Sequence, residues 1–421
     1  MGSATGSIAR WATLAGVAGM LLLWPLACSQ HHSPQRSSAN APIVRVRLLV
    51  ARDSVPLRAA LAPTVQTASE KIAHRLNLPP SSDIPLNLVD GQWHIGNVTI
   101  PGTGTLTLWQ VEDGSVAVNG KTYRGRFRFV PAGGDTFDVI NDVDVDSYLK
   151  SVVPRELLRR WNEETYKAQA IVARTYALYE AKTAGVNRQW DVYPDQRSQV
   201  YGGFDDETEK SREAVDETSG VVVAYGNSGK ERIFKTYFSA CCGGVTQSSL
   251  DAFGEPFLVP LCDQNVHGLC SVASNFNWGP IEIRKDELTR RFRLYGQRRH
   301  RGEQDMAMLA RLEIAAVNRF DRPIRFTAID ANGTHYVFTA EELRNAINGG
   351  VTAQSPQHLP SAFMKIINEP GSAVVRFVEG HGSGHGVGMC QWCSEVRAEA
   401  GVRHEDIVLA AYPRAKLVRA Y

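Results

Sequence analysis

Short runs that alternate hydrophobic and polar residues, or that are rich in β-branched residues, fill the chain between residues 43 and 130. Gly, Pro and Asp residues of the kind that form turns separate these runs. The clearest runs read IVRVRLLV, VTI, TLTLW, VAV and FRFV. Alternation with a period of two is typical of half-buried strands, so we predict a β-rich N-terminal lobe. One helical segment is expected within it, near Val65–Leu76.

A helical period governs residues 163–184. Small and apolar residues recur there every three or four positions, and Gly185 follows as a stop signal. The stripe consists of Tyr166, Ala170, Ala173 and Ala177, widened by Ile171 and Leu178. The pattern predicts one long helix, Glu163–Ala184, that is buried and packs through small side chains.

The segment before this helix, Ser147–Trp161, predicts a shorter helix interrupted at Val153-Pro154, because proline disfavours helical geometry in the residue before it. Proline is also well placed at a helix start, so Glu156 is expected in a first helical turn. The helix dipole alone favours an acidic residue there. That structural explanation of Glu156 competes with a catalytic one.

Four stretches, in order, resemble the stage II sporulation protein D family of cell-wall enzymes. They are VVPRE at Val152–Glu156, KAQAIVARTYAL at Lys167–Leu178, TYFSACCGGVTQS at Thr236–Ser248 and GHGSGHGVGMCQW at Gly380–Trp392. The family's hallmark is the acidic residue in the first stretch followed by the helix in the second. The resemblance extends over residues 95–421. It implies a peptidoglycan lytic transglycosylase with Glu156 as its catalytic acid and base.

Together, the patterns and the resemblance predict an α+β fold. A β-rich N-terminal lobe is expected at residues 43–135. A mixed catalytic domain, with one long buried helix and several short strands, is expected at residues 136–421.

The first 28 residues have the pattern of an export segment. Arg10 supplies a positive charge, Trp11–Ala27 is an apolar run shorter than a usual membrane span, and small Ala27 precedes Cys28. Two interpretations stay open: a lipoprotein that is tethered to a membrane through Cys28, and an ordinary signal peptide cleaved nearby. Residues 29–42 are polar and predict a flexible tether. We therefore expect an exported protein of the periplasm or cell envelope.

The charge balance argues against one class of partner. Lys and Arg total 46 and Asp and Glu total 44, for a net charge of +2. This balance does not produce the strong positive field of nucleic-acid-binding proteins, so no nucleic-acid partner is expected. A basic stretch at residues 290–301 has acidic neighbours on both sides, which favours a solvated face of mixed charge.

Apart from Cys28 the chain has six cysteines, an even number that suits disulfides in an exported protein. They are Cys241, Cys242, Cys262, Cys270, Cys390 and Cys393. The two-residue spacing of Cys390 and Cys393 is also typical of a structural zinc site, which Cys262 and Cys270, flanking His267, would complete. Disulfides and a structural zinc stay open alternatives. No cofactor is expected to be required for catalysis.

The resemblance also implies where a zinc site should be missing. Some members of the family hold zinc near the catalytic acid through a His and two Cys after the long helix. This chain has Tyr193 and Ser198 at the positions of those cysteines. That metal site is therefore not expected here.

Cleavage of a glycosidic bond ordinarily needs two carboxyl groups, and only Glu156 is an evident candidate. A lytic transglycosylase needs one, because the C6 hydroxyl of the sugar itself attacks the anomeric carbon and leaves a 1,6-anhydro-muramic acid end. Glu156 must then start protonated, which burial beside apolar groups favours. Trp161, Tyr237 and Trp392 are available as walls for such a site.

Further candidates for glycan binding are Tyr237, Ser239, His385, Gln391 and Arg174. Tyr237 and Ser239 share one face if Thr236–Ser239 is a strand. His385 and Gln391 lie in a glycine-rich stretch where the backbone can approach a ligand. Each has a structural alternative: an aromatic core residue for Tyr237, a hydrogen-bonded loop for His385, and an ion pair with an acidic residue for Arg174.

The family prefers glycan strands already stripped of peptides, so the resemblance implies an amidase as the partner that acts first. A rival hypothesis is that the chain is a non-catalytic, glycan-binding enhancer of a cell-wall amidase, because relatives of this domain are described as amidase modifiers.

Overall fold

The computed structural model describes residues 40–59, 61–79, 82–110, 115–185 and 188–421. The predicted export segment, with Cys28, and most of the predicted tether lie outside these residues. Among the described residues, no helix combines the length and the hydropathy needed to cross a lipid bilayer.

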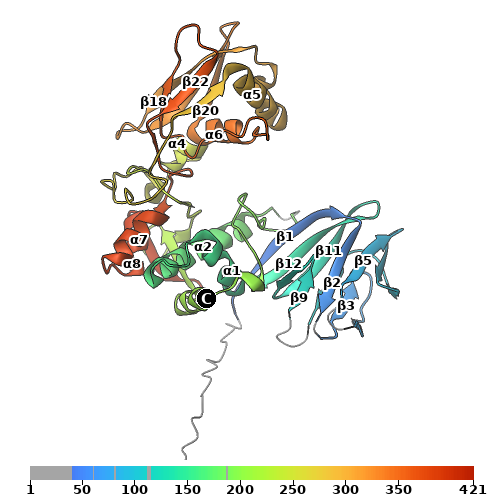
Figure 1. The fold of residues 1–421 in the computed structure, drawn as a ribbon. Helices are drawn as coiled ribbons and strands as arrows, with labels where there is room; N and C mark the ends of the chain where they lie inside the picture. The colour runs from blue at the N-terminus through green and yellow to red at the C-terminus, as the bar shows by residue number, and fades with distance from the viewer. Residues whose placement is uncertain (1–39, 60, 80–81, 111–114, 186–187) are drawn as a thin grey trace, which may run out of the picture. The chain divides into compact units, whose positions relative to one another are not determined.

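Two six-stranded antiparallel sheets form the N-terminal lobe (Figure 1). The first has the order β1-β12-β11-β8-β3-β4 and the second β10-β9-β2-β5-β6-β7. Strands of the first sheet are β1 (Ile43–Arg52), β3 (Thr64–Thr67), β4 (His74–Arg75), β8 (Leu106–Trp109), β11 (Arg126–Gly133) and β12 (Thr136–Asp144). Strands of the second are β2 (Ser54–Ala59), β5 (Ile84–Val89), β6 (Gln92–Ile95), β7 (Val98–Ile100), β9 (Val116–Val118) and β10 (Lys121–Tyr123).

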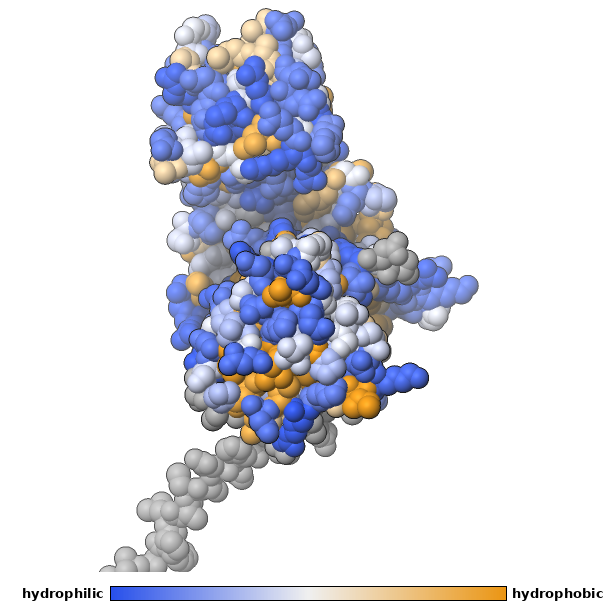
Figure 2. All heavy atoms as spheres, turned by 90° about the vertical axis from the view of Figure 1, so that its right-hand side faces the viewer, coloured by the Kyte–Doolittle hydropathy of each residue, from blue (hydrophilic) through white to orange (hydrophobic). Residues whose placement is uncertain are grey.

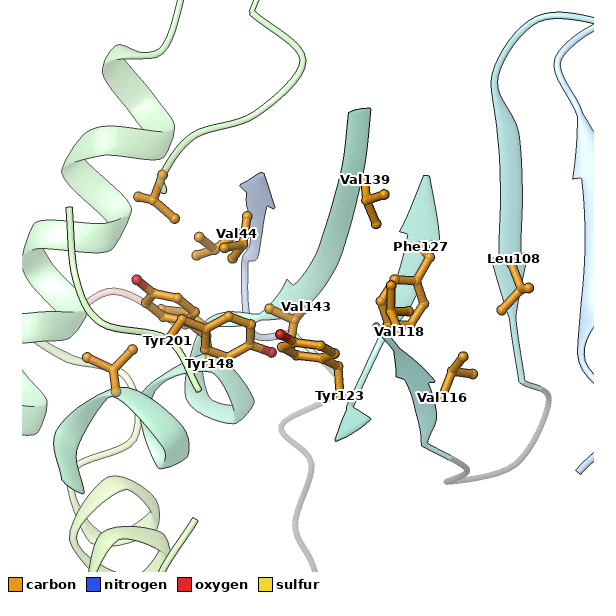
Figure 3. Packing of buried hydrophobic residues seen from close by; sticks show 14 of the residues in the cluster. Val44, Leu108, Val116, Val118, Tyr123, Phe127, Val139, Val143, Tyr148 and Tyr201 are labelled. Atoms are coloured by element: carbon orange, nitrogen blue, oxygen red, sulfur yellow. The ribbon is translucent and has the colours of Figure 1, made fainter. Parts of the chain in front are cut away.

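Aromatic side chains join the two sheets. Trp93 of the second sheet packs against Phe129 and Phe137 of the first, with ring centroids 6.3 and 5.1 Å away. Toward the helices the same core continues through Tyr123, Tyr148 and Tyr201 (Figure 3). Each fully buried aromatic ring contributes roughly 2–3 kcal/mol. The lobe and the helices therefore share one hydrophobic core.

The prediction of a helix near Val65–Leu76 is wrong, because β3 and β4 occupy this part of the chain. Val65 and Thr67 are buried while the residues between and before them are half-buried, which is the period of a strand. Pairing with β8 decides the outcome, and tertiary pairing of this kind overrides local preference.

Helix α1 (Val145–Glu156) runs without a break through Pro154, so the predicted interruption is wrong. Proline removes one backbone donor and leaves the carbonyl four residues earlier without its helical partner. That carbonyl, on Lys150, accepts a hydrogen bond of 2.7 Å from the Ser211 hydroxyl instead. Glu156 consequently lies in the last turn of a helix and not in a first turn.

The long buried helix is confirmed as α2 (Glu163–Thr183), which ends one residue before the predicted end. Asn162 caps its N-terminus by accepting from the Glu164 amide. Arg174 in its middle is fully buried and is bound to Asp146 of α1 at 3.0 Å. The structural alternative for Arg174, an ion pair with an acidic residue, matches these contacts.

The elements that surround α2 come from both sides of the sequence (Figure 1). Helix α3 (Glu209–Glu217) and the sheet β14-β13-β25 pack near it, as do α7 and α8. Their bounds are β13 (Val221–Tyr225), β14 (Arg232–Ile233), α7 (Gln391–Glu399), α8 (His404–Ala411) and β25 (Lys416–Arg419). Helix α4 (Ser249–Phe253) instead contacts α6, β19 and β20. Short β15 (Phe238–Ser239) runs parallel to β24 (Met389–Cys390). The α+β fold class is confirmed.

Residues between β15 and β24 include a lobe with its own hydrophobic core. We call this part of the chain, residues 277–381, the inserted lobe. Its helices are α5 (Lys285–Arg299) and α6 (Ala340–Asn348). Its strands are β17 (Ile281–Arg284), β18 (Leu309–Val317), β19 (Pro323–Asp330), β20 (His335–Thr339), β21 (Lys365–Ile367) and β22 (Val374–Val378). At its base, β16 (Asn277–Trp278) pairs with β23 (Gly380–His381).

The basic stretch at residues 290–301 lies mostly on α5 and only partly matches the expected solvated face. Arg290 and Arg301 bind acidic side chains at part-exposed positions. Arg291, in contrast, is fully buried and donates to the carbonyl groups of Ile347 and Gln357. Arg291 is therefore a structural residue of this lobe, because burial of its charge is compensated by these bonds.

The predicted domain boundary between residues 135 and 136 falls in the turn that joins β11 to β12. The core continues across this point, from Val44 in β1 to Tyr148 in α1. The division at this position stays a prediction.

Figure 2 views the molecule from the side of the β-rich lobe. Hydrophilic residues cover most of this face, and hydrophobic residues gather on one part of it. Exposed large hydrophobic side chains of the lobe include Ile72, which is 67% exposed, and Leu61, which is 47% exposed. Exposed apolar residues of this number are ordinary on protein surfaces and carry no functional conclusion.

We expect the Arg174→Met substitution to lower the free energy of unfolding by about 3 kcal/mol or more, because it leaves Asp146 buried without its cation. Urea denaturation followed by fluorescence and circular dichroism measures this. Arg197→Met is the control, since Arg197 and Asp195 form an exposed pair worth less than about 1 kcal/mol. Equal losses in the two variants would contradict the importance of the buried pair.

Candidate active site

Glu156 is the last residue of α1, and its side chain is half-buried. The backbone amide of Val200 donates a hydrogen bond to its Oε1 at 3.3 Å. The carboxyl group is thus held between the end of α1 and the segment that follows the long helix in sequence.

Gln391, a candidate for glycan binding, meets Glu156. It is the first residue of α7, is only 5% exposed, and its side chain hydrogen-bonds to the Glu156 carboxylate. Its Nε2 also lies 3.4 Å from Oε1 of Gln169 in α2. The structure therefore brings together two predicted residues that are far apart in the sequence.

Burial raises the pKa of Glu156, while the hydrogen bonds from the Val200 amide and the Gln391 side chain oppose that shift. The last turn of a helix carries the negative end of the dipole, which further disfavours a carboxylate. This is the reverse of the stabilisation expected for a first turn. The arrangement favours a carboxyl group that keeps its proton to a higher pH than usual.

Three neighbours of Glu156 were missed by the sequence analysis. Burial is the main cause of the raised pKa of Tyr148 and of Tyr176, and the negative charge of Glu156 adds to both shifts. Gln169 is fully buried, and its Nε2 has no hydrogen-bond partner within the part of the chain that the structure describes. Gln169 and Tyr176 belong to the KAQAIVARTYAL stretch, so the motif itself was the available signal.

The predicted aromatic walls separate into two groups. Trp161 and Trp392 form an edge-to-face pair with ring centroids 5.0 Å apart, and Trp392 directly follows Gln391. Tyr237 instead stacks on Phe253 at 4.5 Å and donates its hydroxyl hydrogen bond to Glu255. Of the predicted aromatic walls, the tryptophan pair is thus the group that lies next to Gln391.

Ser239 and His385 hold the glycine-rich turn. The Ser239 hydroxyl accepts from the amide of Gly386, and Nδ1 of His385 accepts from the amide of Val387 at 3.0 Å. Burial lowers the pKa of His385 to about 4, so the imidazole is neutral at ordinary pH. These contacts match the structural alternative for His385, and glycan binding by Ser239 and His385 stays a prediction.

Four of the predicted cysteines converge. The Sγ atoms of Cys242, Cys270, Cys390 and Cys393 all lie within 4.8 Å of one another, and all four residues are buried. Cys270 joins the Cys390–Cys393 pair as expected, but Cys242 takes the place foreseen for Cys262. Cys241 and Cys242 are adjacent, so their spacing from the other cysteines does not indicate which of them joins the cluster. The path of the main chain after β15 brings Cys242 to it.

Tyr193 and Ser198, which stand where the resemblance would place zinc-binding cysteines, are joined by a hydrogen bond. The Tyr193 amide donates to the Ser198 hydroxyl at 3.1 Å. A hydroxyl and a phenol do not fit the thiolate ligands that zinc prefers. No step of the chemistry below therefore uses a metal at this place.

Residues 133–225 match the family model described as SpoIID, stage II sporulation protein. This match and the similarity to the amidase enhancer described below support the assignment to this family that the motifs indicated. The matched segment holds Glu156, Gln169 and Arg174, whereas the stretches Thr236–Ser248 and Gly380–Trp392 lie beyond it.

Three curated relatives are similar over different lengths. An uncharacterized protein of Brachyspira hyodysenteriae is 28% identical over 305 residues, or 72% of this chain and 74% of that protein. A Bacillus subtilis protein named amidase enhancer is 22% identical over 300 residues, or 63% of this chain but 39% of that protein. An uncharacterized protein of Chlamydia muridarum is 34% identical over 116 residues, 26% of this chain and 40% of that protein.

We expect stability to fall as the pH drops from 6.5 toward 4. In this window the unfolded chain protonates His385 while the folded protein does not, since its folded pKa is about 4. His385→Gln should reduce the loss by up to about 3 kcal/mol, measured by urea denaturation at pH 7 and pH 4.5. The exposed His335 supplies the control His335→Gln. If the free energy of unfolding of His385→Gln fell with pH as much as that of the wild type, the assigned role of His385 would be contradicted.

Proposed function

We propose that the chain is a lytic transglycosylase that cleaves peptidoglycan glycan strands, with Glu156 as general acid and then general base. The observation that carries the proposal is the Glu156 carboxyl group, whose pKa is raised by burial and which is bonded to Gln391. Family membership supports the coarser statement, a role related to the cell wall. No cofactor enters the proposed reaction.

In the first step the protonated Glu156 donates its proton to the glycosidic oxygen, and the bond from that oxygen to the anomeric carbon of muramic acid breaks. A positive, oxocarbenium-like sugar and the Glu156 carboxylate remain. In the second step the carboxylate removes the proton from the C6 hydroxyl of the same sugar, whose oxygen attacks the anomeric carbon. The 1,6-anhydro ring forms, and Glu156 ends protonated as it began.

The surroundings of Glu156 suit both of its roles. Burial and the helix end favour the protonated acid, while the Val200 amide and the Gln391 side chain stabilise the carboxylate that appears between the steps. The Nε2 of Gln169, which has no hydrogen-bond partner among the described residues, supplies a donor for a sugar hydroxyl. Attack within one sugar needs no activated water, so a second carboxylate is unnecessary.

The proposal includes the setting of the reaction. Glycan strands without peptides are the proposed substrate, and a cell-wall amidase that removes the peptides is the proposed partner. Export, with a membrane tether through Cys28 in the lipoprotein case, would bring the protein to this substrate. The rival proposal is a non-catalytic enhancer of that amidase, which the name of the Bacillus subtilis relative favours.

We expect wild-type protein to release glycan fragments with 1,6-anhydro ends from amidase-treated peptidoglycan, and Glu156→Gln to release fewer by a factor of about 1,000 or more, because the amide has no acidic proton. Mass spectrometry of the soluble fragments measures this. Glu163→Gln, at an exposed position in α2, is the matched control and should retain activity. Undiminished cleavage by Glu156→Gln would rule out the assigned role. Cleavage by neither protein, with strand binding retained, would favour the amidase enhancer.

Activity should decline as the pH rises through the pKa of Glu156, because the acid must begin protonated. The Gln391 hydrogen bond lowers that pKa. Gln391→Ala should therefore move the alkaline limb of the pH–rate profile to higher pH by about one pH unit, which corresponds to about 1.4 kcal/mol. Initial rates of fragment release between pH 4 and 9 test this. Gln297→Ala, at an exposed position in α5, should leave the limb in place. A limb that stays or moves to lower pH in Gln391→Ala would contradict the contact.

A further inference from the structure

We propose that Cys242, Cys270, Cys390 and Cys393 bind one structural zinc ion as four thiolate ligands. The proposal goes beyond the cleavage of glycan strands and does not depend on it. The four sulfur atoms come from three separate parts of the chain: the loop after β15, the turn at Cys270, and the start of α7. Their convergence in a buried cluster is the first observation behind it.

The distances between the sulfur atoms have the size of a tetrahedral zinc site. With Zn–S bonds of about 2.3 Å, the edges of the tetrahedron measure about 3.8 Å. Sγ of Cys242 lies 3.6 Å from Sγ of Cys270 and 3.8 Å from Sγ of Cys393. A disulfide needs about 2.05 Å. An iron–sulfur cluster places several irons and sulfides between its thiolates, for which a group within 4.8 Å leaves no room.

Backbone amides support a thiolate at Cys390. Its Sγ accepts from the amide of Cys242 at 3.3 Å and from the amide of Cys393 at 3.4 Å. Cys390 also caps the N-terminus of α7, where the dipole favours negative charge. Hydrogen bonds of this kind orient metal ligands from the second coordination shell.

A buried cation stands beside the cluster. Four thiolates around one Zn²⁺ carry a net negative charge, which is costly to bury without compensation. Arg322, from the turn between β18 and β19, is 1% exposed and donates to the carbonyl oxygens of Cys242 and Val245 at 2.8 and 2.6 Å. The arginine therefore places a positive charge where the zinc site needs one.

The site is closed and consequently structural. All four ligands are at most 5% exposed, and a catalytic zinc would keep an open position for water or substrate. Gln391 lies between Cys390 and Cys393, so the metal would fix the start of α7 and with it the residue that bonds Glu156. The inserted lobe is attached to the same point through Arg322.

The test uses the full chain, purified from zinc-containing medium without chelators. Elemental analysis by mass spectrometry should find one zinc per chain, and zinc-edge X-ray absorption should find four sulfur ligands at about 2.3 Å. Cys270→Ser should lose most of the zinc. Cys262→Ser, a part-exposed cysteine outside the cluster, is the matched control and should keep it.

A second measurement applies if Cys270→Ser does not fold. Zinc removal from the wild-type protein by a chelator should lower the thermal midpoint, and added zinc should restore it, because metal binding is coupled to folding. It should also expose four additional thiols to alkylation. Absence of zinc, disulfides among these four cysteines in the intact mass, bound iron in place of zinc, or full zinc retention by folded Cys270→Ser would each overturn the proposal. None of these readouts depends on glycan cleavage.

Discussion

The buried ion pair between Arg174 and Asp146 is the interaction on which the arrangement around α2 depends. Besides Asp146 in α1, the Arg174 guanidinium binds the carbonyl oxygens of Val215 and Val221, and its Nε lies 3.1 Å from the Tyr421 hydroxyl. One side chain thus links α1, α3, β13 and the C-terminal residue to the middle of α2. Because the charge is buried, every one of these bonds offsets part of its desolvation.

The same scaffold explains the state of Glu156. With α1 held along α2, its C-terminal end presents a carboxyl group at the negative end of the helix dipole, half-buried and beside buried tyrosines. Both effects favour the protonated acid. Gln391 then approaches from a helix that begins after the inserted lobe, so the site is assembled from parts of the chain that only the fold brings together.

Some features could be predicted from the sequence because they depend on local pattern. The apolar stripe from Tyr166 to Ala177 has one natural structure, a buried helix, and Gly185 marks its end. Other features depended on partners elsewhere. The β3–β4 segment forms strands because β3 pairs with β8. Helix α1 continues through Pro154 because the Ser211 hydroxyl donates to the Lys150 carbonyl, which proline leaves without a helical partner. Neither partner is visible in a local window.

By itself, the sequence determined the α+β class, the long helix, the candidate acid Glu156 and the resemblance to the family, because these follow from residue periodicity and from contiguous motifs. The tertiary structure alone decided that Glu156 ends a helix, that Gln391 and Gln169 meet beside it, and that Cys242 rather than Cys262 joins the cysteine cluster. The physical reason is common to all three: burial, hydrogen bonding and ligand geometry depend on distances between atoms, and residues far apart in sequence acquire those distances only when the chain folds.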